Sequence, residues 1–175
     1  MDDLIARVRE ILVTTPERWE RLAESVDIAL LQRRPAPGEW SALQCLQHLL
    51  DTETGAFAVR LEALLAGRDF AAFDPDAAGS KPEPSADPPA LARKFEAARV
   101  RSLVAFDTVT PADLERTARH PELGVVTMRE MLNEWAAHDL MHTVQAERAL
   151  MQPFIVGSGK WRHYCADHDV EAVVS

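Results

Sequence analysis

Apolar residues recur at steps of three and four over four long segments of the chain, and this spacing places them on one face of a helix. The first segment shows the pattern at Leu4, Val8, Ile11, Leu12, Trp19, Leu22, Val26 and Leu30. The sequence predicts helices at about 3–32, 41–66, 89–107 and 127–151, with very little strand signal. The expected fold class is therefore all-α.

Residues that start or stop helices lie near these boundaries. Ser41 is a good N-cap for the second helix, and Thr127 opens a capping-box pattern for the fourth. Pro16 is expected to kink the first helix or to start a new turn, and the fourth helix is expected to stop before Pro153. Residues 154–165 are predicted to pack as an extra short helix across the bundle.

The length of 175 residues suits one domain, taken as 1–175. Prolines concentrate at 74–89, which we expect to be a surface loop too short to separate two domains. That loop also gives the chain a way to cross from one end of a bundle to the other. The last residues, 170–175, are expected to form a mobile tail.

Composition and charge argue against several classes of protein. Apolar residues make up 47% and charged residues 27%, as in globular proteins, and the net charge of −9 argues against a nucleic acid partner. No apolar run reaches about 18 residues, so we expect no membrane span. The acidic start at Asp2 and Asp3 is unlike a signal peptide, which makes the cytoplasm the expected location. Cys45 and Cys165 are then two free thiols.

The candidate functional residues cluster in EWAAHDLMH, residues 134–142. His138 and His142 are four apart, so on a helix their rings lie one turn from each other and reach a single metal ion. Asp139 follows His138, so the HExxH zinc motif is absent. The two histidines continue an inward stripe with Met131, Trp135, Gln145 and Ala149. Burying both rings costs free energy unless each has a partner, and a metal ion satisfies both at once.

A third ligand is needed, and His48 is the best candidate. On the second predicted helix, His48 lies on the same face as Cys45, Thr52 and Val59. The side chains of this face are small and only partly apolar, as in the wall of a cavity. Three histidines plus solvent make an open site that polarises a bound water or substrate oxygen. Asp51, Glu53 and Glu134 are candidate acceptors for the histidine rings. Surface positions are expected for His120, His163 and His168.

Three motifs carry a family resemblance: GEWS at 38–41, LQHLLDTE at 46–53 and EWAAHDLMHTVQ at 134–145. With them the chain resembles the DinB-like superfamily of small bacterial proteins, which includes YfiT-like metal hydrolases and thiol-dependent transferases. The resemblance implies a four-helix bundle with one long crossover and a metal near one end. It also implies His48, His138 and His142 as ligands of a divalent ion (nickel or zinc foremost, then manganese or iron) and assembly as a homodimer.

The expected function is metal-dependent enzyme chemistry on a small-molecule substrate, either thiol transfer or hydrolysis, with Glu134, Asp51 or Glu53 as proton shuttle. A low-molecular-weight thiol is anionic and calls for basic residues at the mouth of the site. Arg60, Arg68 and Arg129 are the candidates, although the sequence does not place them there. Two alternatives stay open: a non-catalytic metal-binding stress-response protein, and a plain bundle with an empty histidine cavity.

Overall fold

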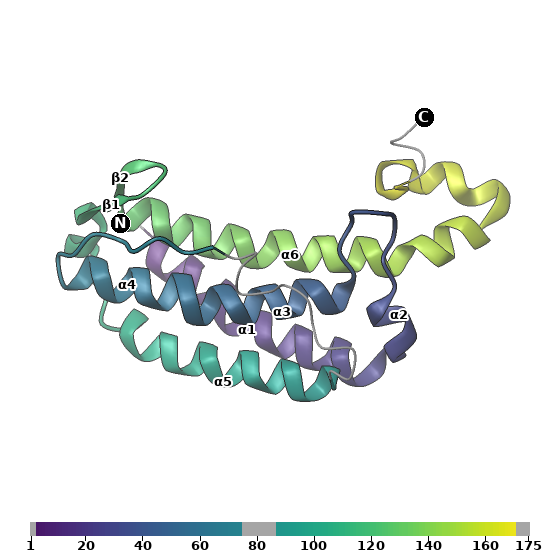
Figure 1. Ribbon diagram of the computed structural model, residues 1–175, viewed down its shortest axis with the longest axis horizontal. Helices are drawn as coiled ribbons and strands as arrows, with labels where there is room; N and C mark the ends of the chain where they lie inside the picture. Colours follow the sequence, from purple (N-terminus) through teal and green to yellow (C-terminus); the bar gives the residue numbers. More distant parts are fainter. Residues whose placement is uncertain (1–2, 75–86, 171–175) are drawn as a thin grey trace.

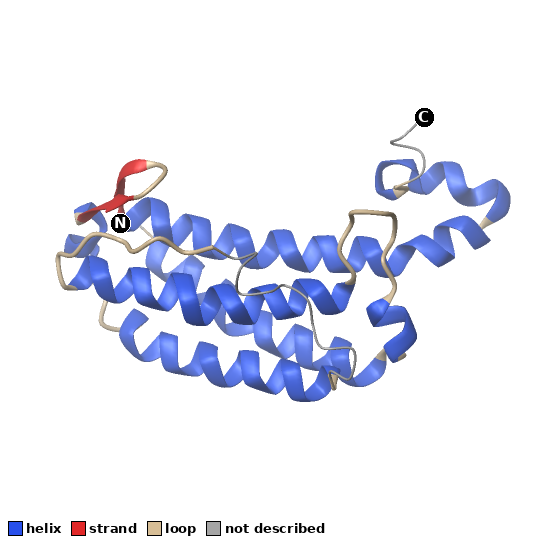
Figure 2. Cartoon of the chain, in the orientation of Figure 1, coloured by secondary structure: helices blue, strands red, loops and turns tan. Residues whose placement is uncertain are grey.

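The computed structural model describes residues 3–74 and 87–170, and most of them are helical (Figure 2). Four long helical rods run side by side (Figure 1). They are α1 (Leu4–Ser25), α3 (Ala42–Thr52) continued by the π-helix η1 (Glu53–Phe57) and by α4 (Ala58–Leu65), α5 (Pro88–Phe106) and α6 (Met128–Gly157). The predicted all-α four-helix bundle is confirmed.

The direction of the rods shows how the chain crosses the bundle. Helices α1 and α6 run one way, whereas α3–α4 and α5 run the other way (Figure 1). Helix α4 ends where α6 begins, and α5 begins at the opposite end, so the connection between α4 and α5 crosses the length of the bundle. Of the predicted proline-rich loop, residues 75–86 lie outside the described residues, as do residues 171–175 of the predicted tail.

Two predicted helix starts are confirmed by reciprocal hydrogen bonds. The Gln44 backbone N–H donates to Ser41 Oγ (3.2 Å), and the Ser41 N–H donates to Gln44 Oε1 (3.1 Å). Thr127 and Glu130 form the same capping box at the start of α6, at 3.1 Å and 2.7 Å. These caps fix where α3 and α6 begin, and both helices carry candidate ligands.

The first and last predicted helices differ from the structure. Helix α1 passes through Pro16 and ends at Ser25. A separate short helix α2 (Ile28–Gln32) follows, and its N-cap Asp27 accepts from the Ala29 N–H at 2.9 Å. The chain is extended at Val26, so the prediction of one helix over 3–32 was wrong.

Helix α6 runs through Pro153 to Gly157, so the predicted stop before Pro153 was also wrong. The final 3₁₀ helix η3 (Gly159–His168) turns back against the end of α6 instead of crossing the bundle (Figure 1). The side chain of Gln152 joins the two: its amide donates to the His168 carbonyl at 2.9 Å, and its oxygen accepts from the Val170 N–H at 3.1 Å. These contacts stabilise the last turns of α6, which continue past Pro153.

A small hairpin precedes α6. After a 3₁₀ turn η2 (Pro111–Glu115), strands β1 (Thr117–His120) and β2 (Gly124–Thr127) pair antiparallel, with Thr117 opposite Thr127. The sequence analysis found very little strand signal and did not predict these two strands. Strands of four residues are too short for a period-two pattern to stand out, which explains why the prediction missed them.

The core divides into two apolar clusters with a polar layer between them. The cluster near the hairpin includes Leu12, Phe57, Phe106, Met128 and Trp135, and the cluster near α2 includes Trp19, Leu43, Leu46, Phe95 and Ala146. At the change from one cluster to the other, each long rod buries polar side chains: Thr15, His48, Thr52, Glu53, Arg99, Ser102, His138, Asp139, His142 and Thr143. Within the described residues, no helix combines the length and apolar character needed to cross a bilayer.

Candidate metal centre

The structure brings the three sequence-predicted histidines together inside the polar layer. His48 comes from α3, and His138 and His142 come from the neighbouring helix α6. All three are buried, and one ring nitrogen of each lies within 4.8 Å of those of the other two. His48 Nε2 and His138 Nε2 are 3.1 Å apart. The site lies between the two apolar clusters of the bundle.

These distances fit a single divalent ion. Metal–nitrogen bonds of about 2.0–2.1 Å at a tetrahedral angle separate two ligand nitrogens by about 3.3–3.4 Å, close to the gap between His48 and His138. Three atoms within 4.8 Å of one another share a point no more than about 2.8 Å from each of them. Movements of less than one ångström would therefore bring all three nitrogens to bonding distance.

The protonation of the rings suits a metal as well. Burial, followed by the neighbouring imidazoles His142 and His48 and the more distant Arg99 and Arg60, lowers the pKa of His138 to about 3. Burial and the charge of His48 lower the pKa of His142 to about 4, although its hydrogen bond to Gln145 opposes the change. At neutral pH both rings are uncharged, and a nitrogen lone pair on each is free to bind a cation.

The second nitrogens of the two α6 histidines have different surroundings. His142 Nδ1 lies 2.8 Å from Gln145 Oε1, so it carries the proton that the amide oxygen accepts, and Nε2 keeps its lone pair for an ion. His138 Nδ1 is buried and has no hydrogen-bond partner in the described part of the chain. The site therefore offers imidazole nitrogens as ligands, and the orientation of the His142 ring is fixed by Gln145.

Aromatic rings border the centre. Trp40 stacks on His142 at a centroid distance of 5.6 Å and an interplanar angle of 16°, and it lies 4.9 Å from the ring of His48. Phe57 meets His138 edge-on at 5.1 Å. Trp40 belongs to the GEWS motif, yet its place against the histidines was not predicted. These two rings therefore pack directly against the imidazoles of the candidate ligands.

A buried ion cluster fills the rest of the polar layer, and the sequence analysis missed its centre, Arg99. This guanidinium is 1% exposed and donates to Asp139 at 2.7 and 3.0 Å and to the Leu12 carbonyl at 2.8 Å. It also pairs with Glu53 at 2.9 Å. A signal did exist, because Arg99 stands between Phe95 and Ser102 at core-facing spacing in the third predicted helix.

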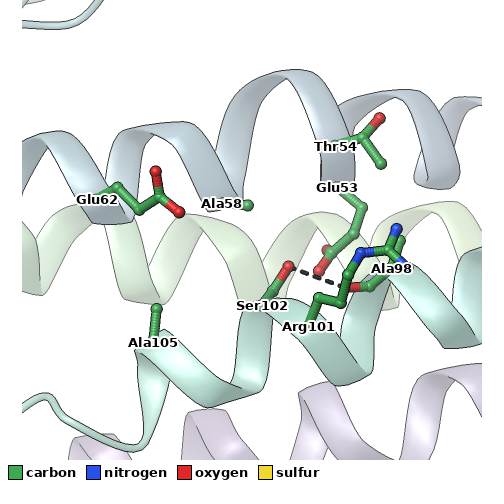
Figure 3. A pocket seen from close by; sticks show the side chains of 8 residues that line it. All are labelled: Glu53, Thr54, Ala58, Glu62, Ala98, Arg101, Ser102 and Ala105. Atoms are coloured by element: carbon green, nitrogen blue, oxygen red, sulfur yellow. Dashed lines mark hydrogen bonds between the residues drawn. The ribbon is translucent and has the colours of Figure 1, made fainter.

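Glu53, which is one of the predicted proton shuttles, belongs to this cluster. It is fully buried, and its Oε2 accepts from Trp135 Nε1 at 3.1 Å as well as pairing with Arg99. Figure 3 shows its carboxylate directed toward α5, beside Ser102. A cavity of about 340 Å³ lies there between the second rod and α5, and small side chains of η1, α4 and α5 line it together with Glu53, Glu62 and Arg101. Glu53 thus holds α5 and α6 to the second rod.

The other two predicted shuttles are placed differently. Asp51 is half-buried on α3, and its Oδ1 accepts from Gln47 Nε2 at 2.9 Å. Its Oδ2 is buried without a hydrogen-bond partner in the described residues, and burial raises the pKa of this carboxyl group. Glu134 is exposed one turn before His138 and lines a second cavity, of about 410 Å³.

The remaining histidines lie away from the centre. His163 and His168 are exposed, as predicted. His120 is half-buried, which corrects the expectation of a surface residue, because its ring nitrogens lie against Arg60 and the backbone of the hairpin turn.

Comparison with known proteins agrees with this architecture. YfiT from Bacillus subtilis, described as a probable metal-dependent hydrolase with an unusual four-helix bundle topology, matches with a TM-score of 0.74 and 18% identity over 85% of this chain and 87% of that one. A DinB-like protein of the same bacterium, YjoA, matches with a TM-score of 0.55 and 19% identity over 82% of this chain and 90% of that one. The search of curated proteins found no match.

At such identities the structural likenesses show the fold alone. Sequence gives the stronger result, because the family model of the DinB superfamily matches residues 11–146. That match begins within α1, covers the three histidines and ends within α6. The chain therefore belongs to the DinB superfamily.

Proposed function

We propose that this protein is a divalent-metal-dependent enzyme that binds one ion through His48, His138 and His142 and catalyses hydrolysis or thiol transfer on a small molecule. The observation that carries the proposal is the convergence of three buried ring nitrogens, two of them on imidazoles that burial keeps neutral. A bound divalent ion would polarise a substrate oxygen and lower the pKa of a water or thiol, which supplies a nucleophile at neutral pH.

The residues of the chain supply the surroundings for this chemistry. Gln145 orients the His142 ring, and Trp40 shields His142 and His48 from bulk water. Asp51 is our first candidate to accept a proton, because one of its oxygens is unpartnered and burial raises the pKa of the group. Glu134 is the second, since it lines the cavity next to the centre.

The ligand atoms of the site bear on which metal binds, and the similar solved structures bear on which reaction is catalysed. Imidazole nitrogens suit nickel and zinc and also accept iron, while manganese prefers oxygen ligands. The description of YfiT as a probable metal-dependent hydrolase supports hydrolysis. Thiol transfer, assembly as a homodimer and a cytoplasmic location remain predictions that rest on the family resemblance and the sequence.

Metal analysis of the purified protein tests the proposal first. We expect about one nickel or zinc ion per chain after loading and dialysis, and loss of that ion in His138→Ala and His48→Ala. His163→Ala, at an exposed position, is the matched control and should keep its metal. A wild type that binds no more metal than the His138→Ala variant would overturn the assignment.

Activity decides between an enzyme and the non-catalytic alternative. Loaded protein is assayed on a panel of esters and amides for hydrolysis, and on electrophiles with a low-molecular-weight thiol for transfer. Turnover that appears with the metal and disappears in His138→Ala supports the enzyme. Full metal binding without turnover on either panel favours a metal-binding protein instead.

A further inference from the structure

The cavity of about 410 Å³ lies next to the metal centre, and Phe57 contacts both. It is enclosed by α4, the first part of α6, the hairpin and Phe70. Phe57 forms part of its wall and also meets the ring of His138 at 5.1 Å. Glu134 lines it one helical turn before His138 on α6. The Phe57 side chain therefore contacts both the cavity and the ring of one candidate ligand, His138.

Most of the wall is apolar. The apolar lining residues are Phe57, Phe70, Leu123, Val125, Val126 and Met131. Leu123 and Val125 on the hairpin are 73% and 66% exposed, so the mouth of the cavity presents uncovered apolar surface. The volume and lining are those of a site for a compact organic molecule.

The polar end of the cavity has too many hydrogen-bond donors. Arg60 Nη2 lies 3.0 Å from His120 Nε2, while the backbone N–H groups of Glu122 and Leu123 approach His120 Nδ1 at 3.2 and 3.4 Å. A neutral imidazole has one acceptor nitrogen, yet both nitrogens of His120 face donors. Arg60 Nε is also buried with no partner in the described residues. At least one further acceptor is needed here.

The charges around Arg60 point the same way. Within the described residues, Arg60 is the only Lys or Arg that lines the cavity, and no Asp or Glu carboxylate forms an ion pair with it. Glu134 and Glu122 act on it from a distance, but burial still lowers its pKa. Glu130, the other acid in the lining, is held by the Thr127 cap. Among the described residues, the Arg60 guanidinium therefore has no close counter-charge.

We propose that this cavity is the substrate pocket of the metal centre and selects a small monocarboxylate with an apolar or aromatic body, its carboxylate bound by Arg60. The proposal rests on the proposed function, in that the metal centre acts on what the pocket holds. Among the arginines considered from the sequence, Arg68 is exposed and Arg129 pairs with Glu115 at 3.0 Å. Arg60 is the one that lines a cavity beside the histidines.

Three probes of the same shape test the charge preference: phenylacetate, phenylacetamide and 2-phenylethylamine, titrated by calorimetry or by NMR into metal-loaded and metal-free protein. We expect phenylacetate to bind about tenfold more tightly than the amide, because a hydrogen bond to a charged acceptor is roughly twice as strong as one to a neutral acceptor. The preference should persist without metal, which separates the pocket from direct coordination of the carboxylate by the ion.

Variants locate the contact. Arg60→Met should reduce phenylacetate affinity to that of the amide, while Arg101→Met, an exposed arginine on α5, should leave it unchanged. Val125→Glu, at the exposed mouth, should weaken the anion and spare the amide even if Arg60→Met folds poorly. Equal binding of acid and amide, a preference for the amine, or an unchanged Arg60→Met would overturn the proposal.

The two proposals fail separately. If Arg60→Met binds metal as the wild type does but loses phenylacetate, the pocket is supported independently of the histidines. If the wild type prefers phenylacetate but holds no metal, the anion pocket stands and the proposed metal chemistry falls.

Discussion

Replacing Arg99 by methionine is the change whose effect the structure defines best. Methionine keeps an unbranched side chain of similar reach, so the cavity left behind is small. The substitution removes the only cation of the described residues that contacts Glu53 and Asp139, whose exposures are 0% and 1%. The Leu12 carbonyl loses its donor as well. Two carboxylates would then stay buried without a counter-charge.

The magnitude follows from that loss. Removing one partner of a buried ion pair costs about 3–5 kcal/mol, because the remaining charge is left without compensation. For a chain of this size each kcal/mol lowers Tm by about 2–4 °C, which gives a fall of about 6–20 °C. Such a loss is a large part of the 5–15 kcal/mol by which a typical domain is stable.

Urea unfolding of metal-free protein, followed by circular dichroism, measures the change without a contribution from metal binding. The matched control is Arg9→Met, which breaks the exposed pair between Arg9 and Asp107 (2.7 Å) and should alter stability little. The triple variant Arg99→Met, Glu53→Gln, Asp139→Asn removes the stranded charges too. We expect it to recover at least half of the loss.

The triple variant tests whether uncompensated charge causes the loss of stability. If it is as unstable as Arg99→Met alone, the lost stability comes from packing or hydrogen-bond geometry and not from uncompensated charge. If Arg99→Met itself unfolds no more easily than Arg9→Met, the buried cluster has no role in holding the rods together.

The helices were predictable because each of them buries a stripe of apolar residues and because caps such as Ser41 and Thr127 act within one turn. The end of α6 was not predictable in this way. Pro153 is a local stop signal, but Gln152 is held by the backbone of residues 168 and 170, and no local pattern reports those contacts.

The candidate site shows the same division. His138 and His142 were identified from their inward stripe, whereas His48 needed the family resemblance. Glu53 was grouped with Asp51 and Glu134 as a candidate acceptor for the histidine rings and as a proton shuttle. At about 100° per residue, however, Glu53 lies roughly 140° around the helix from His48. The structure accordingly places it against Arg99, whose core-facing spacing the sequence analysis did not use.

Three further outcomes are expected. Thr127→Ala should destabilise the protein by about 1 kcal/mol in urea unfolding, since it removes the N-cap of α6; an unchanged midpoint would contradict this. In native protein at pH 8 a thiol reagent should titrate Cys165 rapidly and Cys45 only after unfolding, because burial raises the pKa of Cys45 to about 12. Two fast thiols per chain would contradict that expectation. Trp40→Ala should speed metal loss to a chelator severalfold by uncovering His142, and an unaltered rate would show that Trp40 does not shield the centre.

The polar layer explains why this bundle can present histidines at a fixed place. Asp139 follows His138 directly, so one turn of α6 directs an imidazole to His48 and a carboxylate to Arg99. The ion cluster thereby fixes the rotation of α6 about its own axis, and Glu53 fixes the second rod against the same guanidinium. Because His48 belongs to that second rod, the cluster sets both helices that carry the ligands without contributing a ligand itself. Apolar packing alone would tolerate small slips between rods, whereas a guanidinium shared by two carboxylates does not. Loosening the cluster should therefore weaken metal binding even where the fold survives.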